Sequence, residues 1–88
     1  MEHELLFNWI KNNTTPRSSI NYKYDTSHIR LAFEHDTDIY VTNDNVNDVM
    51  LQLGYHAASF ANDPYLHFNV SSQSQALIIY QNDVLGSH

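Results

Sequence analysis

The segment 42–55, TNDNVNDVMLQLGY, constrains the fold more than any other part of the chain. Its apolar residues recur at the three- and four-residue spacing of one helix face, at Val46, Val49, Met50 and Leu53. Thr42 is a suitable N-cap, and Gly54 supplies the left-handed residue that commonly ends a helix. We therefore predict a helix between Thr42 and Gly54. The apolar face of this helix must be buried, so other elements must pack against it.

Two more helices are predicted before this one. Residues 2–12 are expected to form the first, and the second is expected to begin at Asp25 or Thr26 and to end near His35. Their predicted buried residues are Leu6, Trp9 and Ile10, with Leu5 alongside, and Ile29, Ala32 and Phe33. Between them the stretch 12–25 is rich in Asn, Thr and Ser, which predicts a long polar loop.

Alternating apolar residues predict two strands. In 38–42, Ile39 and Val41 alternate with Tyr40, and the run 65–70 alternates in the same way. We expect these two strands to pair and helices to cover one face, because a two-stranded sheet alone is marginally stable. The tail contains Ser72 and Gln75 at capping-box spacing, followed by Leu77, Tyr80 and Val84 on one helix face. The run 77–80 also has strand preference, but we predict a helix.

The fold class predicted is therefore α+β, with three or four helices packed on a two-stranded antiparallel sheet in a single small domain, 1–88. The predicted core is Leu6, Trp9, Ile10, Ile29, Phe33, Ile39, Val41, Val49, Met50, Leu53, Phe68 and Val70.

Composition excludes several classes of function. Gly54 and Gly86 are the only glycines, so no glycine-rich phosphate loop can be built. The lack of cysteine excludes disulfides, thiolate catalysis and cysteine metal sites. Neither a signal peptide nor a membrane-spanning run is encoded, so we expect a cytoplasmic protein. No cofactor is predicted.

Charge is distributed unevenly along the chain. The net charge is −6, and all four cations (Lys11, Arg17, Lys23 and Arg30) lie within positions 11–30. Binding to nucleic acid or to an anionic membrane needs clustered Lys and Arg, so neither is expected. A basic protein partner is favoured over nucleic acid, although excess surface acid mostly serves solubility. The predicted partner-binding residues are Glu34, Asp36, Asp38, Asp44, Asp48 and Asp63.

No pattern of residues predicts catalysis or a metal site, and we expect a protein that is not an enzyme. Side chains with metal-ligand chemistry gather at Glu34, His35, Asp36 and Asp38. They lack the calcium-loop pattern, and neighbours at a helix end point in different directions, which favours a solvated turn. His67 is the best acid–base candidate, because Tyr65 and Asn69 lie near it on one strand face. The simpler interpretation is a partly exposed strand histidine.

Several short motifs carry a resemblance: Ile29-Arg30 with Phe33-Glu34, Tyr40-Val41-Thr42-Asn43, Met50 through Gly54-Tyr55, and Phe68-Asn69-Val70. Together they resemble a family of small phage and mobile-element proteins of Gram-positive bacteria, similar in kind to anti-CRISPR proteins. The resemblance implies a helix-helix-strand-helix-strand scaffold and a mobile-element setting, without a catalytic assignment.

The functional expectation is an acidic DNA mimic. The surface of the third predicted helix and the turn before it would bind a basic groove on a host nucleic-acid enzyme, such as a CRISPR nuclease, and inhibit it. The alternatives are a winged-helix-like transcriptional regulator, whose recognition helix would carry Asp44 and Asp48 and so repel DNA, or an oligomerising scaffold. A homodimer is also expected, because a small core gains from burying Phe60 and Tyr65 against a second copy.

Overall fold

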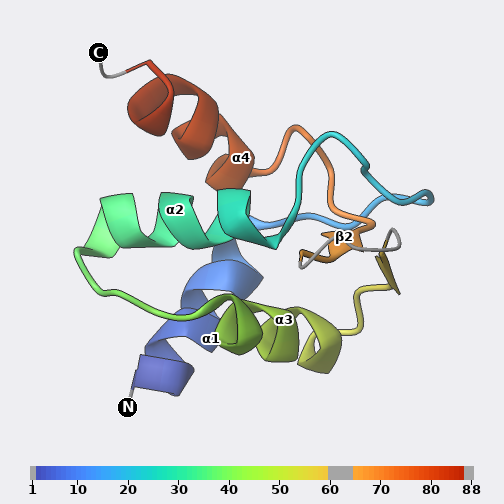
Figure 1. Ribbon diagram of the computed structural model, residues 1–88, viewed down its shortest axis with the longest axis horizontal. Coiled ribbons are helices and arrows are strands. Elements are labelled where there is room, and N and C mark those ends of the chain that lie inside the picture. Colours follow the sequence, from blue (N-terminus) through green and yellow to red (C-terminus); the bar gives the residue numbers. More distant parts are fainter. Residues whose placement is uncertain (1, 60–64, 87–88) are drawn as a thin grey trace.

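The computed structural model describes residues 2–59 and 65–86. The elements follow in the order α1 (Glu2–Asn13), α2 (Thr26–Thr37), α3 (Asn43–Gln52), β1 (Ala57–Ala58), β2 (His67–Phe68), α4 (Gln75–Ile79) and a π-helical turn η1 (Tyr80–Val84). Helix α2 lies in the middle of the molecule, with α4 and η1 on one side and α1 and α3 on the other (Figure 1). The α+β class predicted from the sequence is confirmed. None of the helices in the described ranges has the length and apolar character needed to cross a lipid bilayer.

Helix α2 begins at the predicted N-cap, Asp25. The Oδ1 atom of Asp25 accepts a hydrogen bond from the Ser27 backbone N–H at 2.9 Å, and the Nδ1 atom of His28 accepts one from the Asp25 N–H at 2.9 Å. This reciprocal capping box satisfies N–H groups that a helix start would otherwise leave unpaired. Burial alone would raise the pKa of Asp25, but the hydrogen bonds from the Ser27 hydroxyl and backbone N–H, together with the neighbouring His28 side chain, outweigh it, so the pKa is lowered.

The lowered pKa of Asp25 predicts a pH-dependent contribution to stability. Because the folded state favours the carboxylate, the contribution is complete above the ordinary pKa of 3.8 and is lost as the pH falls through the lower folded-state value. Asp25→Ala should lower the free energy of unfolding by about 1 kcal/mol at neutral pH. The penalty should shrink in strongly acidic buffer, measured by urea unfolding at several pH values. A penalty that did not change with pH would contradict this account.

Helix α3 matches its prediction. The Thr42 side chain accepts from the Asn45 N–H at 3.1 Å, and the Asn45 side chain accepts from the Thr42 N–H at 3.2 Å. Gly54, at a φ of 92°, turns the chain just after the helix. The residues buried on this helix are Val46, Val49 and Met50.

The core forms where the four helices meet the sheet. Eight of the predicted core residues are buried there, and Trp9, Ile39, Val41 and Leu53 are half-buried against them. Tyr24 and Tyr55 also belong to the core, although neither was predicted to. Leu5 does not lie on the buried face of α1, because it is 53% exposed whereas the adjacent Leu6 is fully buried.

The sheet pairs different segments from those expected. Strand β2 runs antiparallel to β1, with Ala57 opposite Phe68 and Ala58 opposite His67. The predicted partner, 38–42, is not a strand. Its backbone N–H groups are used locally: Asp38 donates to the Glu34 backbone oxygen, Ile39 to the Thr37 hydroxyl, Val41 to the Glu34 carboxylate and Thr42 to Asn45. A segment whose donors are already committed cannot extend a ladder.

The polar stretch between α1 and α2 is not a free loop. It runs antiparallel along the other side of β2, through backbone hydrogen bonds from Ser71 to Thr15, Arg17 to Asn69, Asn21 to Phe68 and Thr26 to Leu66, all between 2.7 and 3.0 Å. Pro16 and Val70 form an isolated antiparallel bridge in this series. Strand β2 is therefore the central one of three extended segments.

This central position buries both faces of β2. Phe68 is 1% exposed as the alternation predicts, but His67 is only 6% exposed, so the interpretation of His67 as partly exposed is wrong. The Nδ1 atom of His67 lies 2.9 Å from the backbone oxygen of Tyr24, a contact that requires a proton on Nδ1.

The tail is helical, as predicted, but it is capped differently. Helix α4 starts after Ser74, whose side chain makes no capping hydrogen bond, and Ser72 instead accepts from the Asn21 side chain at 2.9 Å. Leu77 is buried, and Tyr80 packs against the core. The last turn widens to a π-helix, closed by the hydrogen bond from the Leu85 N–H to the Tyr80 oxygen.

Candidate functional site

Four of the predicted acidic residues are exposed on one continuous piece of chain. Asp36 and Asp38 lie at the end of α2, and Asp44 and Asp48 lie one turn apart on α3. We call these four residues the acidic surface. Two devices hold the surface in place: Asp38 adopts a left-handed conformation at a φ of 60° that ends α2, and the Thr42 cap starts α3 four residues later. The carboxylates are thus presented by fixed backbone.

Glu34 does not belong to this surface. Its side chain is only 10% exposed, and Oε1 accepts from Nη1 of Arg30 at 3.0 Å while Oε2 accepts from the Val41 N–H at 3.1 Å. Arg30 also donates from Nε to the Asn43 side chain at 2.7 Å. The ion pair therefore fastens the loop between α2 and α3 to α2, and its two charges largely cancel.

Asp36 is exposed but positioned by the core. Its Oδ2 accepts a hydrogen bond of 2.7 Å from Nε1 of Trp9, which joins α1 to the end of α2. The Trp9 ring packs edge-on against Phe33, with 5.4 Å between ring centroids. The hydrogen bond from the indole therefore orients the Asp36 carboxylate, whose negative charge stays at the surface.

The remaining predicted site residue, Asp63, lies outside the described residues. Tyr40, which was not predicted as a site residue, is 81% exposed in the loop that joins the two acidic helix ends. The signal for it was present in the sequence, since Tyr40 is the odd member of the alternation that half-buries Ile39 and Val41.

Two cations, Arg17 and Lys23, belong to the segment between α1 and α2. The middle of this segment reaches the opposite end of the long axis from the loop between α2 and α3 (Figure 1), and its end returns to α3, where the Thr26 hydroxyl donates to the Asn47 side chain at 2.6 Å. Arg17 donates to the backbone oxygens of Ser19 and Ile20, each at 3.0 Å. Lys23 lies 5.4 Å from the centroid of the Tyr24 ring. Neither of these two cations forms an ion pair with the four carboxylates of the acidic surface among the interactions of the described residues.

The described ranges hold no group of three or more acidic, histidine or cysteine side chains arranged to bind a metal ion. His28 is engaged in the α2 cap, and buried His67 contacts the Tyr24 backbone. The geometry of these histidines suits structural roles.

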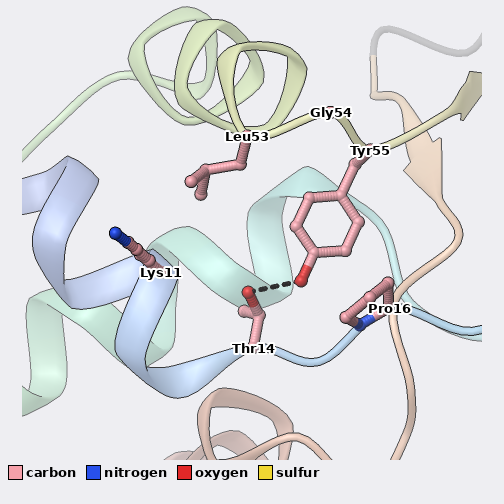
Figure 2. A pocket seen from close by; sticks show the side chains of 6 residues that line it. All are labelled: Lys11, Thr14, Pro16, Leu53, Gly54 and Tyr55. Carbon is pink, nitrogen blue, oxygen red and sulfur yellow. Dashed lines mark hydrogen bonds between the residues drawn. The ribbon is translucent and has the colours of Figure 1, made fainter.

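A pocket of about 320 Å³ lies away from the acidic surface, where α1 and α3 both end. The pocket could not be predicted from the sequence, because its lining comes from two distant segments: Lys11, Thr14 and Pro16 from one, and Leu53, Gly54 and Tyr55 from the other. Figure 2 shows the two segments facing each other, with the Tyr55 hydroxyl donating to Oγ1 of Thr14 at 2.7 Å.

Comparison with known proteins assigns no family: no family model matches the chain, and no curated protein or solved structure is significantly similar to it.

Proposed function

We propose that this chain is a protein-binding inhibitor whose acidic surface docks in a basic groove of a host nucleic-acid enzyme and excludes the nucleic acid. The observation that carries the proposal is the uneven charge along the chain: four exposed carboxylates lie on the end of α2 and on α3, whereas no Lys or Arg follows Arg30. A cluster of exposed carboxylates attracts a positive groove, which raises the association rate and the specificity.

The fixed backbone of the acidic surface supports this function. A groove that binds phosphates presents Arg and Lys at set positions, so an inhibitor gains from carboxylates that are already ordered. Asp36 is held by Trp9, and Asp44 and Asp48 stand on a helix with a closed capping box. Tyr40, at the centre of this surface, adds an aromatic side chain of the kind that dominates many protein interfaces.

The acidic surface gives a direct test. Changing Asp44 and Asp48 together to Lys should abolish inhibition of DNA cleavage, because two attractive contacts become repulsive. The assay would use purified CRISPR nucleases and restriction enzymes of Gram-positive bacteria. Both residues are exposed, so the fold should survive, as circular dichroism would verify. A matched control, Glu4→Lys with Asp83→Lys, changes the net charge equally at exposed positions on other elements.

Salt provides the second arm of this test. Exposed charges are screened beyond about 8 Å at physiological ionic strength, so the association rate should fall as salt rises. If the Asp44/Asp48 variant inhibits as well as the parent, or if the control loses inhibition to the same degree, the proposal fails.

A second candidate, a winged-helix-like regulator, is favoured by the topology. Three helices are followed by the β1–β2 pair, and the segment between α1 and α2 pairs with β2 on the side opposite β1. That is the order of helices and strands in a winged helix, in which α3 would be the recognition helix. Asp44 and Asp48 on this helix oppose contact with phosphates. Binding of the parent protein to bare DNA at about 150 mM salt would favour this candidate over the inhibitor.

Self-association remains a separate proposal. Phe60 lies outside the described residues, and Tyr65 is half-buried. The net charge of −6 opposes the approach of a second copy except at high salt.

A further inference from the structure

The pocket between the ends of α1 and α3 is held open by its own hydrogen bonds. Thr14 donates from Oγ1 to the Ile10 backbone oxygen at 2.7 Å and accepts from the Tyr55 hydroxyl at the same distance. This chain of two bonds fixes the Tyr55 ring, which is only 9% exposed. Tyr55 reaches Thr14 because Gly54 turns the chain back after α3 at a φ of 92°. The walls are therefore set before any ligand arrives.

The interior of the pocket is largely apolar. Leu53, Pro16 and the Tyr55 ring supply carbon surface around the space, and a Cβ added to Gly54 would meet no atom within 4 Å. In Figure 2, Lys11 lies across the pocket from Tyr55 and Pro16 with its ammonium end directed away from them, so this charge lies at the rim, and Leu53 lies between them on the α3 side. The volume of about 320 Å³ is at the small end of the range for small-molecule sites.

The charge of the lining restricts the ligand. Among the described residues that line the pocket, Lys11 is the sole ionised side chain, and none is Asp, Glu or His. Divalent metals are therefore disfavoured, because they need such ligands. Doubly charged phosphates are disfavoured as well, because α1 and α3 present their C-terminal ends here, and against the partial negative charge of these ends the single lysine can offset one anionic charge but not two. A ligand with one negative charge on an apolar body can form an ion pair with the lysine and apolar contacts with the walls of the pocket.

We propose that this pocket binds a small monocarboxylate with a ring-sized apolar body. The ring lies between Leu53 and the aromatic face of Tyr55, and the carboxylate pairs with the ammonium group of Lys11 at the rim. Burial of the ring supplies most of the affinity, and the exposed ion pair selects the acid over its neutral analogue. The site is independent of the acidic surface and does not rest on the inhibitor proposal.

Benzoate is the probe for this site, with benzamide as its uncharged analogue. Titration of the ¹⁵N-labelled protein with benzoate should shift the amide signals of Leu53, Gly54 and Tyr55 along a saturable curve, with a dissociation constant of roughly millimolar order. Benzamide should bind roughly three- to fivefold more weakly, which is the worth of one exposed ion pair.

Two lysine variants complete the experiment. Lys11→Met keeps the aliphatic stem and removes the charge, so it should weaken benzoate binding by the same roughly three- to fivefold and leave benzamide binding unchanged. Lys23→Met, at an exposed lysine outside the pocket, should change neither. The native amide spectrum of each variant verifies its fold. Shifts that fail to saturate, that spread equally over the surface, or that persist undiminished in Lys11→Met would overturn the proposal.

Discussion

Met50→Ala is expected to lower the free energy of unfolding by about 2–5 kcal/mol, the usual cost of truncating a buried large side chain. Met50 is fully buried on α3, and α3 packs against both α1 and α2. The loss therefore removes contacts at the centre of the molecule. A chain of this length has a total stability of about 4–13 kcal/mol, so the loss takes a large share of it and should lower the melting temperature by about 10 °C or more.

The next residue of the same helix is the control for this prediction. Leu51 is 50% exposed, so Leu51→Ala should change the stability by less than about 0.5 kcal/mol. Urea unfolding followed by circular dichroism measures both variants. Equal losses at the two positions would show that the helix is rotated about its axis relative to this structure.

Asn69→Leu should cost about 2–3 kcal/mol, although it replaces a polar residue in the sheet by an apolar one of similar size. The Asn69 side chain accepts from the His56 N–H at 2.7 Å and donates to the Arg17 oxygen at 3.0 Å. It thus binds both of the segments that flank β2. Both hydrogen bonds are partly buried, and leucine would leave these two backbone groups without their partners, at a cost of about 1–3 kcal/mol.

Asn8→Leu is the matched control, because Asn8 is exposed on α1 and the chemical change is identical. Its effect on the free energy of unfolding should be near zero. Amide hydrogen exchange gives a second measurement: in Asn69→Leu the His56 amide should exchange much faster, since its hydrogen bond is gone. Unchanged protection at His56 would contradict the assigned role of Asn69.

The helices could be predicted from the sequence because their signals are local. The Thr42 cap, the apolar stripe of α3 and the turn at Gly54 fall within one short segment, and the Asp25 cap of α2 is equally local. Their hydrogen bonds join residues only a few positions apart, so spacing along the chain is sufficient evidence.

The pairing of the strands could not be predicted in this way. Residues 38–42 have the alternation of a strand, but Glu34 and Thr37 take up their backbone donors. Ala57 and Ala58 have little strand preference, yet they pair with β2 because the turn after α3 brings them beside it. Tertiary position decided both cases.

Only part of the candidate site could be predicted, because the rest of it also depends on tertiary position. Exposure of Asp44 and Asp48 follows from the phase of an amphipathic helix, whereas the burial of Glu34 depends on Arg30 and on the path of the following loop. The pocket depends on a contact between Thr14 and Tyr55, 41 positions apart, that no local pattern encodes.

The central place of β2 has a consequence for the order of folding. Its two neighbours, the segment after α1 and strand β1, both precede it in the chain, so neither can pair until β2 has left the ribosome. The Thr15 N–H finds its acceptor on Ser74, 59 positions later. Closing so long a loop is slow compared with helix formation, so the sheet is completed last. Until then the stretch after α1 is unpaired and must not aggregate. Its polar Asn, Thr and Ser side chains keep it hydrated during this time.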